Sequence, residues 1–209
     1  MEASDLNRTC HAQIIPSSLA VMRCILLGLF YLCSSVQVGF SQSISIPAAR
    51  DPKFNTSINP RSNSRINPRY NSSIDPKYNS SIDPKYNSSI DPKYNTSIDP
   101  KYNTSIDPKY NTSLDPNYNS SIDPTRSRWS GYYVFDLDGD LSGVAVQAND
   151  KFFLFYDLRP KWTGYFASNG KGGFNWFNRE GEWLGYLVNN SERGLNLYST
   201  DGKWLGFLN

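Results

Sequence analysis

The chain contains almost no cysteine or histidine. Its 209 residues include three cysteines and one histidine, and Cys10, His11, Cys24 and Cys33 all precede residue 34. Beyond that point the sequence offers no thiol for a disulfide, a nucleophile or a soft metal, and no imidazole for general base catalysis. Because no serine stands in a nucleophile motif either, the sequence predicts no enzyme, no catalytic residue and no cofactor.

Long apolar runs are also scarce. The run from 24 to 38, about 15 residues, is too short for a comfortable membrane span and is typical of a signal-peptide core. Small residues precede a cleavage point before Gln42, and a start at Met22 would place Arg23 as the positive charge ahead of the core. We therefore expect residues 1–41 to be a signal peptide, with a retained signal anchor as the alternative. The chain is predicted to be secreted or displayed at the cell surface, or periplasmic in a Gram-negative host, with no further membrane contact.

An excess of basic charge is missing too. The formal net charge is +2, and residues 129–209 contain seven Lys and Arg against nine Asp and Glu. Phosphate backbones are bound through a concentrated basic surface. Nucleic acid is therefore not an expected partner.

What the sequence has in excess is one octapeptide, of which NSSIDPKY is typical. After a short linker at 42–50 it recurs nine times over residues 51–124, with proline at every eighth position. Proline at that spacing excludes any helix longer than about two turns. Asp-Pro, Asn-Pro and Asn-Ser steps favour turns, so each copy contains two turn-forming stretches.

The array allows two structures. Tyrosine and isoleucine alternate every four residues, which would place them on one side of an extended chain, and two copies could form one coil of a β-solenoid. However, two apolar side chains in eight residues hardly offset the entropy lost on ordering. The favoured prediction is an extended or disordered stalk that sets a distance.

Eight copies also contain an N-x-S/T acceptor for N-linked glycans, and the copy at Asn63 fails because Arg65 occupies the third place. In a eukaryotic host these asparagines are candidate glycosylation sites: Asn55, Asn71, Asn79, Asn87, Asn95, Asn103, Asn111 and Asn119.

The composition changes within the last segment, 125–209. From Trp129 on, 19 of 81 residues are aromatic, and a second repeat places Leu141, Trp162, Trp183 and Trp204 at intervals of 21 residues. Each unit has an aromatic residue six places earlier, a turn pair between, and a glycine two places later. This pattern predicts four β-hairpins that close into a ring, since closure protects the end strands. The glycines are expected where backbones approach closely.

These residues resemble the 4-fold β-flower domain, a small module of four hairpin petals. The resemblance covers about 40% of the chain and rests on the pattern aromatic-x5-Trp-x-Gly-Tyr/Phe. The first unit departs from it with Leu141 and Val144, and the second with Pro160. The resemblance implies an all-β, propeller-like disc and no particular activity.

Acidic residues are weak candidates for chemistry. Asp136, Asp138 and Asp140 begin like a calcium loop, but Leu141 and Gln147 stand where that loop needs glycine and glutamate. A turn at Asp138-Gly139 explains them better, so no metal site is predicted. A second acidic pair, at 180 and 182, flanks another hairpin turn, and no cleft is evident.

Aromatic rings are the stronger candidates, because they stack on sugar rings and on cationic groups. The predicted ligand-binding residues are Trp162, Trp183, Trp204, Tyr165, Tyr186 and Phe207. The alternative is that an 80-residue domain needs these rings for its own core. The sequence thus predicts a non-enzymatic binding module for carbohydrate or cell-wall polymer, or alternatively a structural protein that stacks through its array or self-associates.

Overall fold

The computed structural model describes residues 44–122, 130–190 and 192–209. The predicted signal peptide lies outside these residues. The described part of the chain contains eight β-strands and five short 3-10 helices but no α-helix, so the predicted all-β class is confirmed. The strands are β1 (Gly131–Asp136), β2 (Leu141–Asn149), β3 (Phe152–Asp157), β4 (Trp162–Ser168), β5 (Phe174–Asn178), β6 (Trp183–Asn189), β7 (Leu195–Ser199) and β8 (Trp204–Leu208).

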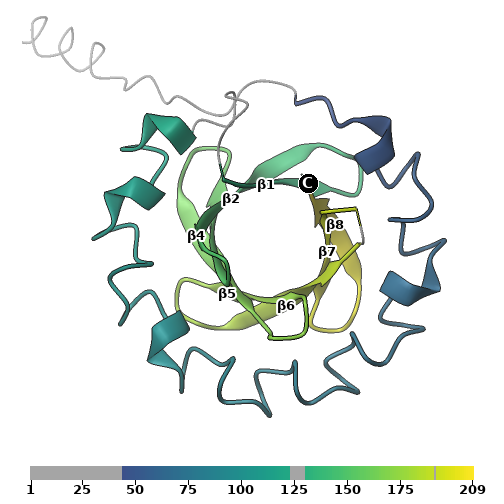
Figure 1. Ribbon diagram of the computed structural model, residues 1–209, viewed down its shortest axis with the longest axis horizontal. Helices are drawn as coiled ribbons and strands as arrows, with labels where there is room; N and C mark the ends of the chain where they lie inside the picture. The colour runs from purple at the N-terminus through teal and green to yellow at the C-terminus, as the bar shows by residue number, and fades with distance from the viewer. Residues whose placement is uncertain (1–43, 123–129, 191) are drawn as a thin grey trace, which may run out of the picture. The chain divides into compact units, whose positions relative to one another are not determined.

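The eight strands form a closed antiparallel barrel in chain order. Strand β1 also pairs with β8, from Val134 opposite Leu208 to Asp136 opposite Gly206. Figure 1 looks along the barrel and shows the strands as a closed ring. Closure leaves no strand edge with unpaired backbone groups.

Both faces of the barrel wall are apolar. Alternate strand residues point to opposite faces, and in β3 Phe153 and Phe155 join one cluster while Phe152, Leu154 and Tyr156 join another. The first cluster fills the barrel interior, which eight strands leave just wide enough for side chains. The second cluster lies on the outside of the barrel and must be covered to be kept from water.

The octapeptide array supplies that cover. Figure 1 shows residues 51–122 as a belt around the barrel, and the text below calls this segment the belt. Ile106, Leu114 and Ile122 are buried in the same cluster as the outward residues of β2 to β5. The 3-10 helices are η1 (Ala48–Arg50), η2 (Ser64–Ile66), η3 (Thr96–Ile98), η4 (Thr112–Leu114) and η5 (Ser120–Ile122).

The array therefore does not form the extended or disordered stalk that the sequence predicts. It does not form a β-solenoid either, because residues 44–122 contain no strand. The sequence-based prediction weighed two apolar side chains per copy against the entropy lost on ordering, and it considered each copy in isolation. In the folded chain the isoleucines pack on an apolar wall already built by the barrel.

Hydrogen bonds fix the register of the belt on the barrel. Four outward side chains donate to belt carbonyls: Tyr156 to Leu114 at 2.9 Å, Asn175 to Ile82 at 3.2 Å, Asn196 to Ile58 at 3.1 Å and Tyr198 to Ile66 at 2.6 Å. Residues 175 and 196 are 21 apart and their acceptors, 82 and 58, are 24 apart. Three octapeptides of the belt thus span the same arc as one 21-residue repeat of the barrel. The belt runs around the barrel in the opposite direction to the strand order, because the later donor, Asn196, bonds to the earlier acceptor, Ile58.

Glycines allow neighbouring strands to approach closely. A Cβ atom on Gly143, Gly164, Gly185 or Gly206 would lie 2.1 to 2.4 Å from a carbonyl oxygen of the next strand. The acceptor carbonyls belong to aromatic residues at 21-residue spacing: Tyr156, Phe177, Tyr198 and Phe135. The expected close approach is confirmed at these glycines, although it is to a neighbouring strand and not to a central axis.

We expect Gly185→Ala to destabilise the protein by about 2–4 kcal/mol, because the added methyl group would meet the Tyr198 carbonyl oxygen at 2.1 Å and move the backbone. Urea unfolding followed by tryptophan fluorescence measures the effect. Ser80→Ala, at an exposed position of the belt, is the control and should change stability by less than about 0.5 kcal/mol. Equal stability of the two variants would contradict the close approach.

Candidate binding surface

Each octapeptide is held by its own side chains. In the copy that begins at Asp83, one carboxylate oxygen accepts from the Lys85 N–H at 2.8 Å, and the Asp83 carbonyl accepts from the N–H groups of Tyr86 and Asn87. The Asn87 side chain then accepts from the Ser89 N–H and hydroxyl. Aspartate and asparagine favour such turns because their side chains replace a backbone acceptor. The result is a rigid unit with a fixed inner and outer side.

The inner side carries isoleucine and the outer side carries tyrosine. Seven of the nine Ile and Leu side chains in the belt are less than 9% exposed, and Ile74 and Ile98 are partly buried. The aromatic residues four places earlier are 63–76% exposed: Phe54, Tyr70, Tyr78, Tyr86, Tyr94, Tyr102, Tyr110 and Tyr118. The expectation that tyrosine and isoleucine share one side is wrong, because the chain between them is folded into turns and is not extended. We call these eight rings the aromatic rim.

Basic side chains accompany the rim. The Lys93 ammonium lies 5.5 Å from the centre of the Tyr94 ring, and equivalent pairs form at Arg69, Lys77, Lys101 and Lys109. These basic residues are exposed, whereas the aspartates that precede the four lysines are buried or half-buried and accept hydrogen bonds from the backbone. An array that is near neutral in sequence therefore presents a cationic and aromatic outer side.

The three predicted tryptophans are half-buried where β4, β6 and β8 begin. Arg179 covers the Trp162 ring at 4.8 Å, and Arg61 of the belt covers Trp204 at 5.5 Å. Trp183 lines a cavity of about 330 Å³ together with Tyr86. The tryptophans are thus separate, partly covered rings and do not form one open surface.

The other predicted binding residues are structural. Tyr165, Tyr186 and Phe207 are 0%, 1% and 2% exposed, so a ligand in solution cannot reach them. They stack on outward rings of neighbouring strands beneath the belt, with Tyr186 and Tyr198 at 5.5 Å between ring centres. Their burial favours the alternative, in which the domain uses these rings for its own packing.

Four tyrosines of the outer barrel wall are unusual acids. Burial raises the pKa of Tyr156, Tyr165, Tyr186 and Tyr198 far above the ordinary value of about 10. Nearby belt aspartates add to the effect at the first three. The hydroxyl groups of Tyr165 and Tyr186 are buried without a hydrogen-bond partner among the described residues. These phenols are therefore held neutral.

The predicted glycosylation asparagines have a structural role. Each donates from its side-chain nitrogen to the carbonyl six residues earlier, as Asn87 does to Ser81 at 2.6 Å, and Asn63 does the same to Ser57. All of them are half-buried. These bonds join successive copies of the octapeptide.

The acidic candidates lie at turns. One Asp136 carboxylate oxygen accepts from the N–H groups of Asp138 and Asp140, both at 2.9 Å, which fixes the β1–β2 turn. Glu180 and Glu182 are exposed on the β5–β6 turn. Within the described ranges, no group of three or more potential metal ligands is found, and no helix is long and apolar enough to cross a membrane.

Searches with this chain find no matching family model, no matching curated protein and no matching solved structure. The candidate surface therefore rests on the geometry alone. Sequence reasoning missed the aromatic rim because it assigned tyrosine and isoleucine to one side. The available signal was that a lysine or arginine directly precedes six of the seven belt tyrosines, whereas only one belt isoleucine, Ile66, follows a basic residue.

Proposed function

We propose that this protein is an exported, non-enzymatic binding protein whose aromatic rim recognises an acidic polysaccharide of the cell wall or extracellular matrix. The observation that carries the proposal is the set of eight rings, 63–76% exposed, at eight of nine equivalent positions of one belt, the ninth being Ser62. Single exposed aromatic residues are ordinary on protein surfaces, but a regular series is not.

The chemistry of the rim suits such a ligand. A tyrosine face packs on the C–H face of a sugar ring, and the phenol hydroxyl forms hydrogen bonds at the edge. At five of the rings, the lysine or arginine beside the ring provides a charge partner for a carboxylate or sulfate on the same sugar. A neutral polymer would leave these cations without a partner.

Repetition favours a polymeric ligand. One tyrosine–cation pair binds weakly, and five such pairs along one belt can engage sugars of one polymer chain with high effective concentration. The barrel holds the belt in a curve, so the pairs are pre-organised before the ligand arrives.

We further propose that the barrel is the four-hairpin β-flower that its sequence resembles. The support is the recurrence every 21 residues of a β-bulge, before Phe135, Tyr156, Phe177 and Tyr198. In this reading the flower is the scaffold and the belt is the binding element.

A glycan array that contains uronic-acid, sulfated and neutral polysaccharides tests the function. We expect the chain to bind acidic polymers, with affinity that falls as salt rises. Replacing Tyr78, Tyr94 and Tyr110 by serine should weaken binding about ten-fold, at about 0.5 kcal/mol for each ring. The control variant replaces the exposed Ser72, Ser80 and Ser88 by alanine and should bind normally.

Self-association is the second candidate function, because the same exposed rings can pair with those of another copy. Light scattering of the full chain over a range of concentrations separates the two. A concentration-dependent mass that the tyrosine variant abolishes, together with no glycan binding, would favour assembly over polysaccharide recognition.

A further inference from the structure

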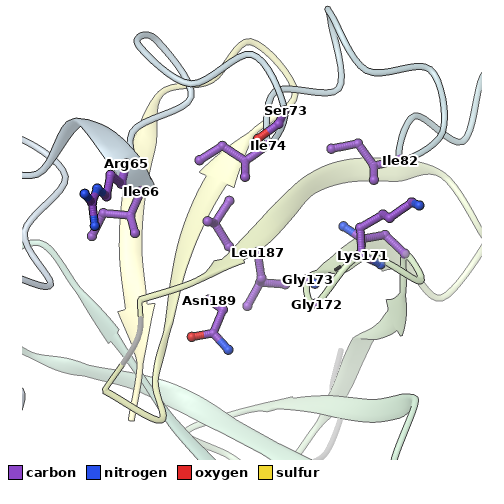
Figure 2. Close-up of a pocket in the computed structure, with 12 residues that line it drawn as sticks. Arg65, Ile66, Ser73, Ile74, Ile82, Lys171, Gly172, Gly173, Leu187 and Asn189 are labelled. Carbon is purple, nitrogen blue, oxygen red and sulfur yellow. Dashed lines mark hydrogen bonds between the residues drawn. The ribbon is translucent and has the colours of Figure 1, made fainter.

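A cavity of about 260 Å³ lies between the belt and the barrel, beside the loop that joins β4 to β5. Figure 2 shows apolar side chains in its centre, with Arg65 and Lys171 on opposite sides of them. The apolar lining includes Ile66, Ile74 and Val188, which pack in one cluster on the outer face of the barrel. Arg65 and Lys171 are the only charged residues among the twelve described residues that line the cavity, so this lining contains no carboxylate.

The cavity arises where the belt is not tied to the barrel. The carbonyls of Ile66 and Ile82 accept hydrogen bonds from Tyr198 and Asn175. Between them, no barrel side chain in the described part of the chain donates to the Ile74 carbonyl, and Ile74 stays partly buried. The belt is thus tied to the barrel at Ile66 and Ile82 but not at Ile74 between them, and this leaves a space over β6.

The two cations are particular to this position. Arg65 occupies the place where the other eight copies carry serine. Lys171 lies in a loop whose counterpart 21 residues later carries Glu192. A second cavity lies at Ile122, Val146 and Gln147, and the described residues of its lining include serine, asparagine and glutamine but no charged residue. Packing of the belt thus does not require the positive charges.

We propose that this cavity binds a small amphiphilic anion, an aliphatic carboxylate whose chain lies on Ile66, Ile74 and Val188. The carboxylate pairs with the Arg65 guanidinium, which forms two parallel hydrogen bonds to such a group, and Lys171 contributes a second charge. The volume is below the range of drug-sized sites, which fits a short chain. The site is separate from the aromatic rim and does not depend on polysaccharide binding.

Octanoate is the probe for this site. Isothermal titration calorimetry of the full chain should show saturable binding at one site, and 1-octanol, which has the same chain without the charge, should bind at least ten-fold more weakly. Arg65→Ser, which restores the residue of the other copies, should weaken octanoate binding about ten-fold and leave octanol binding unchanged. Lys171→Glu should weaken it further, because it places an anion in the site.

Lys109→Ser, on the exposed rim, is the control and should leave octanoate binding unchanged. Circular dichroism melting checks that Arg65→Ser folds, as expected from the eight copies with serine. The proposal is overturned if octanoate shows no saturable binding to the native chain. It is also overturned if folded Arg65→Ser binds octanoate as tightly as the native chain does.

Discussion

Raising the pH from 9 to 11 is expected to destabilise this protein by about 6 kcal/mol, enough to unfold it if its stability is that of an ordinary domain. The cause is the set of four neutral tyrosines in the outer wall of the barrel, Tyr156, Tyr165, Tyr186 and Tyr198, whose pKa values burial raises. In the unfolded chain these phenols ionise near pH 10, whereas in the folded chain they stay protonated.

The sign follows from the protons bound in each state. Below about pH 10 both states are protonated, so the tyrosines give no pH dependence there. Above it the unfolded state loses protons that the folded state keeps, and the free energy of unfolding falls by about 1.4 kcal/mol per pH unit for each tyrosine. Urea unfolding at pH 8, 9, 10 and 11 measures this slope.

Phenylalanine variants separate the contribution of each ring. Tyr165→Phe and Tyr186→Phe remove buried hydroxyl groups that have no partner in the described structure, so each should raise stability at pH 8 by about 1 kcal/mol and lower the alkaline slope. Tyr156→Phe and Tyr198→Phe also lower the slope, but each loses a bond to the belt and should reduce stability at pH 8 by about 1 kcal/mol. Stability that is unchanged between pH 9 and 11 would contradict burial of these rings.

Replacing Ile82 and Ile106 by serine is expected to lower stability by about 6 kcal/mol, at about 3 kcal/mol for each buried side chain. Both side chains are at most 3% exposed, and each loses its apolar contacts and places a hydroxyl group against the barrel. The double variant should therefore be largely unfolded at 25 °C, as judged by near-UV circular dichroism.

The matched control uses the tyrosines four residues earlier. Tyr78 and Tyr102 are 66% and 63% exposed, so replacing both by serine should cost about 1 kcal/mol or less. A stalk that does not touch the barrel predicts the same small effect for both variants. The two double variants thus distinguish a belt from a spacer in one experiment.

The two repeats and most of the strand organisation could be read from the sequence, because they depend on local patterns. Asp138-Gly139 marks a turn, and Gly185 marks a close approach wherever its strand lies in the barrel. The position of the array could not be read in this way, since it depends on what the barrel offers to it. Asn175 and Asn196, polar residues at outward positions of apolar strands, were the available signal, and both are 0% exposed beneath the belt.

The roles of the aromatic residues could not be predicted from the sequence for the same reason. Tyr165 and Tyr186 look like surface residues on a four-hairpin disc considered alone, and only the belt makes them internal. The same belt places the opposite set of rings in water. An interpretation that treats the two halves as separate domains therefore reverses which aromatic residues can meet a ligand.

The match of three octapeptides to one 21-residue step sets an upper limit on the length of the array. Four such steps complete the circumference, so about twelve copies would bring the array back to its own beginning, where Lys53 already donates to the Asp138 carbonyl. If the array were an extended stalk, gene duplications could lengthen it without such a limit. Natural variation in copy number should consequently favour gains or losses of three and should stop before the ring is full.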